Sequence, residues 1–331
     1  MQKYLLILVL ALSMTSIAQA KKGVLSGGVD HAMPGWFKES FMEIAEDTEE
    51  AKEENKHVIL FFHVAQCPYC AQMLDNFDAE LKPYIQKNFD IIAINTRGAR
   101  EVAFSEDVSM TERQLARKLK VQYTPTLIYL DGDNNQVLRT NGYRDKDTMR
   151  NILSFVASKS YKKTSLNQYL TSKAKKLPYP KRPNPLFKNI TDLSKIKTPL
   201  AVIFDQADCA ACDKFYNHTL KGQFVKDETS KLTWVRLNAQ SNQAIITPDG
   251  KKTTPLQWAN TLKLSYRPGL VLFDQGKEIE RVDTFLYLYH FGNMLRYVAD
   301  GHYKKYERYL QYSGVRRTEL LDMGVDINIV K

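Results

Sequence analysis

Residues 57–70 read HVILFFHVAQCPYC, an apolar run that is followed within a few residues by two cysteines in C-x-x-C spacing. The run from His57 to Phe62 has the length and the β-branched and aromatic content of a strand buried in a sheet. From Pro68 onward, apolar residues recur at helical spacing, at Met73, Leu74, Phe77 and Leu81. The stretch therefore predicts a strand, a cysteine pair at the start of a helix, and an α/β domain around them.

The same order of elements returns in the second half of the chain. The apolar run Leu200–Phe204 leads into Cys209-Ala-Ala-Cys212, as the first run leads into Cys67-Pro-Tyr-Cys70. Each half later carries a proline into another predicted strand, at Pro125 and at Pro268. We interpret this as an internal duplication: two α/β domains in tandem, residues 21–160 and 198–312, each a mixed central sheet flanked by helices. Residues 313–331 are predicted to be a C-terminal tail.

All four cysteines of the chain lie in these two pairs. The spacing favours a disulfide within each pair, and because so small a ring adds little stability, its expected use is thiol–disulfide exchange. A zinc site would also use such pairs, although the two C-x-x-C knuckles of a zinc site normally lie ~15–20 residues apart. Thiolates that hold copper, and buried thiols without a reaction, would fit the same four residues. We expect no metal and no cofactor.

The first twenty residues have the three parts of a secretory signal peptide. They combine the basic Lys3, an apolar run from Leu5 to Leu12, and an Ala-Gln-Ala end at Ala20. The apolar run is shorter than the ~20 residues that span a bilayer, so an uncleaved anchor is the weaker interpretation. We expect export, cleavage after Ala20, and no membrane-spanning segment in the mature chain.

The formal net charge is +10, which by itself would suit a nucleic-acid or anionic-surface partner. The excess is concentrated in residues 161–197, where basic side chains and four prolines accompany a single acidic one, Asp192. We therefore expect no nucleic-acid partner and predict a basic linker, part of it extended and exposed. The linker could instead serve as a docking site for an anionic membrane or an acidic partner.

The strand, the C-x-x-C pair at a helix start and the later proline at a strand entry together resemble the thioredoxin fold, in both halves. The chain is more closely similar to the periplasmic SoxW-like thioredoxins. The matching residues are Asn88-Phe89, Thr96–Gly98, Gln114–Ala116, Val121–Thr126 and Gly142-Tyr143, then Trp258-Ala259, Tyr266–Pro268, His290-Phe291 and Tyr297-Val298. The resemblance implies a periplasmic thiol–disulfide oxidoreductase that reduces protein disulfides and receives electrons from a membrane-bound donor.

A helix N-terminus favours the thiolate form of a cysteine placed there, because unpaired N–H groups and the helix dipole point at the sulfur. Cys67 is therefore expected to attack a substrate disulfide, and Cys70 to resolve the mixed disulfide. Cys209 and Cys212 are expected to take the same roles. The resemblance further implies cis bonds at Thr124-Pro125 and Arg267-Pro268, with an extended substrate pairing beside them.

The sequence departs from the thioredoxin pattern near both pairs. Gln66 and Asp208 stand where a Trp usually precedes the first cysteine, and Phe61 and Ile203 replace a buried carboxylate. Proton handling is therefore assigned to two candidates, each four residues before its cysteine: His63 and Asp205.

Arg267 is expected to place a cation beside the second pair, which would make that couple the more oxidising of the two. Electrons could then pass between the pairs, or the second domain could only bind partners. Two different functions would fit the same cysteines: a disulfide oxidase or isomerase, and a thiolate metal-handling or partner-binding module.

Overall fold

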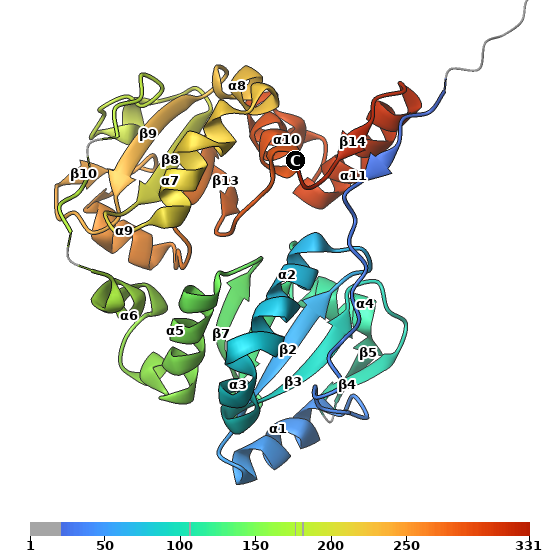
Figure 1. Ribbon diagram of the computed structural model, residues 1–331. Coiled ribbons are helices and arrows are strands. Elements are labelled where there is room, and N and C mark those ends of the chain that lie inside the picture. Colours follow the sequence, from blue (N-terminus) through green and yellow to red (C-terminus); the bar gives the residue numbers. More distant parts are fainter. Residues whose placement is uncertain (1–20, 106, 176, 181) are drawn as a thin grey trace, which may run out of the picture.

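The computed structural model describes residues 21–105, 107–175, 177–180 and 182–331, which form two α/β lobes (Figure 1). The predicted signal peptide, residues 1–20, lies outside the described residues. Among the helices that are described, none has the length and apolar character needed to cross a membrane.

The first lobe is built on a four-stranded mixed sheet. Its strands are ordered β3 (Phe89–Asn95), β2 (His57–His63), β6 (Thr126–Leu130) and β7 (Gln136–Asn141). Strand β2 runs parallel to β3 and antiparallel to β6, which is antiparallel to β7. Every residue of β2 from His57 to Phe62 is buried, as the apolar run predicts.

Helices cover both faces of this sheet. Successive side chains of β2 point to opposite sides, and because they are apolar on both sides, each face must be buried. Ile59 and Phe61 pack with the apolar residues of α2 (Pro68–Asn76), α3 (Lys82–Asn88) and α5 (Lys146–Ala157). Val58, Leu60 and Phe62 pack with α1 (Ile44–Glu53) and α4 (Glu112–Lys118). Between α2 and α3 the helix widens into a π-helical turn, Phe77–Leu81.

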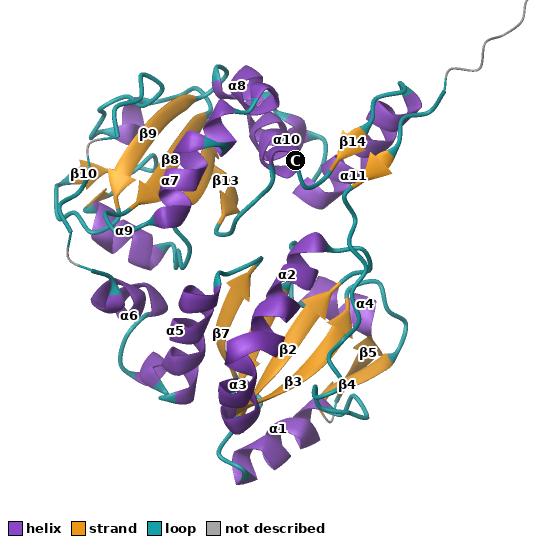
Figure 2. Ribbon diagram, viewed as in Figure 1, coloured by secondary structure: helices purple, strands orange, loops and turns teal. Residues whose placement is uncertain are grey.

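The second lobe has a sheet with the same strand order and the same directions (Figure 2). Strand β8 (Leu200–Asp205) runs parallel to β9 (Thr233–Asn238) and antiparallel to β12 (Gly269–Asp274), which pairs with β13 (Lys277–Val282). One face packs on α7 (Ala210–Asn217), α8 (Gln223–Thr229) and α10 (Leu288–Ala299), the other on α9 (Pro255–Thr261).

The predicted strands at Pro125 and Pro268 begin immediately after each proline, at Thr126 and Gly269, since proline has no N–H for the strand ladder. Helix α1 begins at Ile44, just after Met42, which has a positive φ of 70°, and Glu43, which bridges to Ala103.

Each lobe also inserts a small hairpin between the second and third strands of its sheet in chain order. In the first lobe it pairs β4 (Glu101–Ser105) with β5 (Val108–Thr111), within the segment 98–112. In the second lobe it pairs β10 (Ile245–Ile246) with β11 (Lys252–Thr253).

The linker, residues 161–197, is more ordered than predicted. It contains α6 (Leu166–Lys173), which contacts both α5 and α9 and so lies between the lobes (Figure 1). Phe187 bridges to Trp234 of β9, and Leu193 is fully buried in the second lobe. The apolar side chains of these parts are buried in the lobes, whereas Pro178, Pro183 and Pro185 are exposed and lie outside any helix or strand, and most of the basic side chains described are also exposed.

Segments near the two ends of the described chain pair with each other beside helix α11 (Tyr309–Asp322) (Figure 1). The tail was predicted to begin at residue 313, but this position lies inside helix α11. After that helix, β14 (Ile327–Asn328) pairs in parallel with β1 (Leu25–Ser26).

Candidate active site

The first cysteine pair forms a disulfide at the N-terminus of α2. Cys67 occupies the N-cap position, and its Sγ accepts a hydrogen bond from the backbone N–H of Cys70 at 3.1 Å. Pro68 follows at the first helical position, where its missing N–H leaves no donor unsatisfied. The helix N-terminus thus presents the Cys70 N–H to the Cys67 sulfur, an arrangement that favours the thiolate form.

The segment at Thr124 lies directly against this sulfur. Cys67 Sγ is 3.4 Å from Thr124 Oγ1 and 3.6 Å from the Thr124 carbonyl oxygen, although the residues are 57 positions apart. Thr124-Pro125 and Arg267-Pro268 are both cis, as predicted. The structure thus brings the predicted nucleophile and the predicted substrate-pairing residue together in the first lobe.

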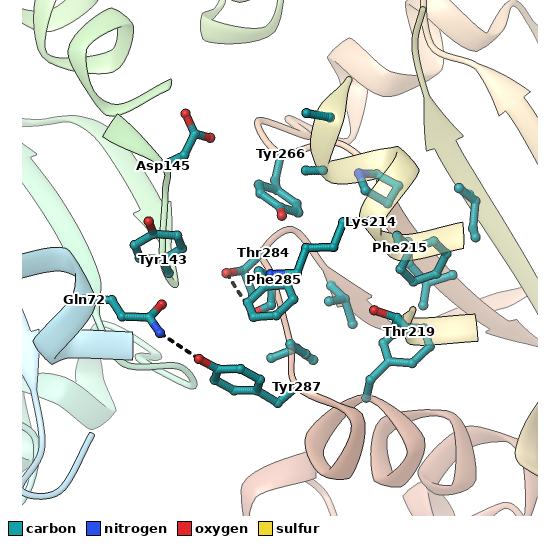
Figure 3. Close-up of a pocket in the computed structure, with 18 residues that line it drawn as sticks. Gln72, Tyr143, Asp145, Lys214, Phe215, Thr219, Tyr266, Thr284, Phe285 and Tyr287 are labelled. Carbon is teal, nitrogen blue, oxygen red and sulfur yellow. Dashed lines mark hydrogen bonds between the residues drawn. The ribbon is translucent and has the colours of Figure 1, made fainter. Parts of the chain in front are cut away.

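A loop of the second lobe covers the first pair, which the sequence did not predict. The loop Thr284–Tyr287 connects β13 to α10, and the backbone N–H of Tyr287 donates to Tyr69 Oη at 2.8 Å. The two tyrosine rings pack with centroids 4.9 Å apart. Gln72 Nε2, one turn along α2, donates to Tyr287 Oη at 2.7 Å (Figure 3). Cys67 is left only 4% exposed, and Cys70 is fully buried.

A buried arginine holds this covering loop in place. Arg144, with no exposed surface, follows β7 and donates to Ser265 Oγ at 3.1 Å and to the carbonyl oxygen of Asp283 at 2.8 Å. Its guanidinium also lies 3.5 Å from Asp283 Oδ2 and stacks over the ring of Tyr266. Because Asp283 immediately precedes the loop, these contacts tie the loop to the first lobe.

The second pair also forms a disulfide, at the N-terminus of α7. The backbone N–H of Cys212 donates to Cys209 Sγ at 3.0 Å, as in the first pair. Cys212 is fully buried, but Cys209 is partly exposed and Ala210 is exposed. A cavity of about 390 Å³ between the lobes is lined by Ala210 and Ala211 of this motif, with Tyr143 and Asp145 facing them from the first lobe (Figure 3).

Arg267 is engaged by its own loop and by the linker. Its partly buried guanidinium donates to the carbonyl oxygens of Leu264 and Tyr266 and to Asn167 Oδ1 on α6. Burial lowers the pKa of Arg267 to about 10, so the group remains a cation at neutral pH. Among the described residues it forms no hydrogen bond to Cys209 or Cys212, and the more oxidising potential of the second couple stays a prediction.

Asp205 is enclosed by the linker and α7. Its carboxylate accepts hydrogen bonds from Tyr179 and Tyr216 and an ion pair from Arg182 at 3.3 Å. Burial raises the pKa of Asp205, although these donors oppose the shift. The carboxylate thus anchors the linker to the second lobe, a role that the sequence did not reveal.

His63 ends β2 and packs its ring edge-to-face with His31, at 5.6 Å between centroids. Burial lowers the pKa of His63 to about 4, so the imidazole is neutral near pH 7. In the described chain neither His63 nor Asp205 hydrogen-bonds a cysteine. No cluster of three or more His, Cys, Asp or Glu that could hold a metal occurs in the described part either.

Comparison with known proteins identifies the first lobe. Residues 44–157, from the start of α1 to the end of α5, match the family described as the thioredoxin-like domain. A thioredoxin-fold protein from Helicobacter pylori is 22% identical, covers 39% of this chain and 92% of its own, with a TM-score of 0.32. A thioredoxin from Thermus thermophilus is 23% identical, with coverages of 32% and 77% and a TM-score of 0.26. No curated protein matches the chain.

The first lobe therefore contains a thioredoxin-like domain, and it carries a C-x-x-C pair at the N-terminus of α2. Together these features support thiol–disulfide oxidoreductase chemistry in general.

Proposed function

We propose that this chain is an exported thiol–disulfide oxidoreductase that reduces disulfides of periplasmic proteins through Cys67 and Cys70. The observation that carries the proposal is the placement of Cys67 Sγ at a helix N-terminus, 3.4 Å from Thr124 Oγ1, inside a thioredoxin-like domain. The helix end favours a thiolate at Cys67, and Thr124 offers backbone groups to a substrate strand beside it.

The reaction needs no group beyond the two thiols. The Cys67 thiolate attacks one substrate sulfur, a Cys67–substrate bond forms, and the other substrate sulfur leaves with the electron pair and takes a proton. The Cys70 thiolate then attacks Cys67 Sγ, the Cys67–Cys70 disulfide forms, and the second substrate sulfur leaves in the same way. The substrate gains two electrons and two protons, which the dithiol loses.

The reductive direction rests on the resemblance to SoxW-like thioredoxins. Reduction potentials of thioredoxin-fold pairs run from about −270 to −120 mV, so the fold permits either direction. Turnover as a reductase requires a dithiol donor, and for an exported protein we propose one bound to the membrane.

We propose that the second lobe is a second thioredoxin-like domain that arose by internal duplication. Its sheet order, its disulfide at the start of α7 and the cis Arg267-Pro268 bond support this. Because Cys209 is partly exposed whereas Cys67 is covered, the second pair is the more accessible entry point for an electron donor. Electrons would then pass from Cys209 and Cys212 to the first pair.

The test is to trap substrates in the producing cell. In Cys70→Ser the resolving thiol is lost, so Cys67 should accumulate as mixed disulfides whose partners mass spectrometry identifies in the exported fraction. Cys67→Ser with Cys70→Ser is the matched control, since it lacks the attacking sulfur. Adducts no more abundant than in this control would contradict the proposal.

Two further measurements address direction and relay. A reductase should hold Cys67 and Cys70 mainly as thiols in the cell, whereas an oxidase should hold them as a disulfide. If electrons enter through the second lobe, Cys209→Ser should leave the first pair oxidised in the cell but reducible by an added dithiol in vitro. An unchanged redox state of the first pair in Cys209→Ser would exclude the relay.

A further inference from the structure

Cys67 opens onto a cavity of about 760 Å³ that both lobes line. Its charged side chains are five arginines that converge from three segments: Arg97 after β3, Arg113 and Arg117 on α4, and Arg308 and Arg317 at α11. No Asp, Glu or Lys of the described chain lines this cavity. The smaller cavity beside the second pair differs, because it has one anion, Asp145, and one cation, Lys214.

These five arginines differ from the other arginines of the chain in having no partner for the guanidinium group among the described residues. The chain has fifteen arginines, all within the described residues, and in ten of them the guanidinium donates to a carbonyl, an amide or a carboxylate oxygen. The remaining five are those of the cavity: within the described chain their side chains form no ion pair and no hydrogen bond. The unpaired arginines of the described chain are thus concentrated at the first pair.

Stability of the fold does not account for this arrangement. Arg113 and Arg117 are four residues apart on α4, a spacing at which like charges repel each other. Arg308 and Arg317 come from the other lobe and add charge of the same sign to the same space. A concave, partly apolar surface lined by one sign of charge focuses its field and raises the local concentration of ions of the other sign.

We propose that the first pair acts on disulfides that carry carboxylates close to the sulfur atoms, and this inference rests on the proposed function. Guanidinium groups bind carboxylates through paired, charge-assisted hydrogen bonds. The aromatic walls at Tyr69, Tyr123 and Phe285 accept the apolar part of such a substrate. An acidic peptide segment and a small dicarboxylate disulfide share this chemistry. Because Cys67 is 4% exposed and reached through this cavity, we expect its protein substrates to present their disulfide on an extended segment that enters the cavity.

The reaction step is the one already described, with the substrate placed by its charge. Its carboxylates pair with the arginines, one substrate sulfur bonds to Cys67 Sγ, and the other leaves with the electron pair. The two electrons come from the reduced Cys67–Cys70 dithiol, which an added small dithiol prepares before the experiment.

The test compares single-turnover reduction rates of matched disulfides by the full-length protein, reduced and then freed of reductant. Two peptides share one disulfide and differ only in flanking residues, Asp/Glu in one and Lys in the other. A second matched pair, 3,3′-dithiodipropionate and cystamine, distinguishes a small-molecule source from a peptide source. Alkylation followed by peptide mapping identifies which cysteine pair became oxidised.

At low ionic strength the acidic peptide should be reduced at least about tenfold faster than the basic one through Cys67 and Cys70, and high salt should erase the difference. Arg113→Gln with Arg117→Gln should lower the ratio several-fold. The matched control, Lys118→Gln with Lys120→Gln, removes the same charge from exposed residues that do not line the cavity and should leave the ratio unchanged.

The outcomes separate the two proposals. Equal rates for the acidic and basic members of both matched pairs would refute the charge preference and leave the oxidoreductase function intact. An equal fall in the ratio in the lysine control would also refute it, because general surface charge would then be the cause. If a verified dithiol reduces none of the four disulfides, both proposals fail. A preference confined to 3,3′-dithiodipropionate would support the small-molecule source, and one for the acidic peptide a peptide source.

Discussion

Replacing Arg144 with Met should loosen the contact between the lobes and uncover the first disulfide. Arg144 has no exposed surface, and it is the buried cation that ties Asp283, the residue before the covering loop, to the first lobe. Met fills much of the same volume and cannot donate. The substitution therefore removes the hydrogen bonds and the charge while leaving little empty space.

The magnitude follows from the contacts that are lost. Two donors from the guanidinium cross between the lobes, to Ser265 Oγ and to the Asp283 carbonyl oxygen. Breaking a buried ion pair from one side costs about 3–5 kcal/mol. Asp283 keeps three other donors, the backbone N–H groups of Ser265 and Tyr266 and the Ser265 hydroxyl, so we expect the lower end, about 3 kcal/mol.

Two assays check this expectation. Urea unfolding should show the loss in stability, and in the reduced protein Cys67 should react faster with an alkylating reagent, because the loop opens more often. Arg150→Met is the matched control: Arg150 is 48% exposed and pairs with the exposed Glu80, so its loss should cost less than about 1 kcal/mol. A change in Arg144→Met no larger than in this control, or an unchanged Cys67 alkylation rate, would refute the reasoning.

Three further predictions concern single groups. In the reduced wild-type protein Cys209 should react with an alkylating reagent faster than Cys67. The ratio of the two rates should be about tenfold for each ~1.4 kcal/mol that displacing the loop Thr284–Tyr287 costs, and equal rates would count against the covering loop. Tyr179→Phe removes a donor to the buried Asp205 carboxylate, so urea unfolding should show a loss of about 1.5–3 kcal/mol and proteolysis of the linker should quicken; an unaltered linker would contradict the anchoring role. Burial lowers the pKa of His57 to about 4, below the ~6.5 of an unfolded histidine. The unfolded chain therefore takes up the proton first as pH falls from 6.5 to 4, and the free energy of unfolding decreases across that window by up to about 1.4 kcal/mol per pH unit. Burial lowers the pKa of His63 and His290 to about 4 as well, so His57→Gln should reduce the slope there by its own share and leave it unchanged above pH 7.

The strands and helices that carry the two cysteine pairs were predictable because their signals are local. The run from His57 to Phe62 is buried on both faces of the sheet, and the C-x-x-C pairs begin helices at Pro68 and Ala210. The contact of Cys67 with Thr124 was reached only through the resemblance to a known fold, since nothing in the intervening residues specifies it.

The features that govern access to the first pair were missed. Tyr287 lies 218 positions after Tyr69, and no periodicity links residues so far apart. One signal was present in the sequence: residues 285–291 read FLYLYHF. So many aromatic residues are unusual in a loop and a helix start that are exposed to water, and they indicate a buried contact. Asp205 and Arg267 were identified from the sequence as candidate site residues. The linker residues that hydrogen-bond to them, Tyr179 and Asn167, could not be predicted.

Hydrophobic periodicity and cysteine spacing, which act over a few residues, decide where this chain forms strands and helices and which sulfur atoms pair. Tertiary structure decides that Cys67 is covered while Cys209 is accessible, that Arg267 turns to Asn167, and that five unpaired arginines surround one cavity. The reason is physical: burial and charge at these sites are sums over side chains from both lobes, and only the docking of the lobes brings those side chains together.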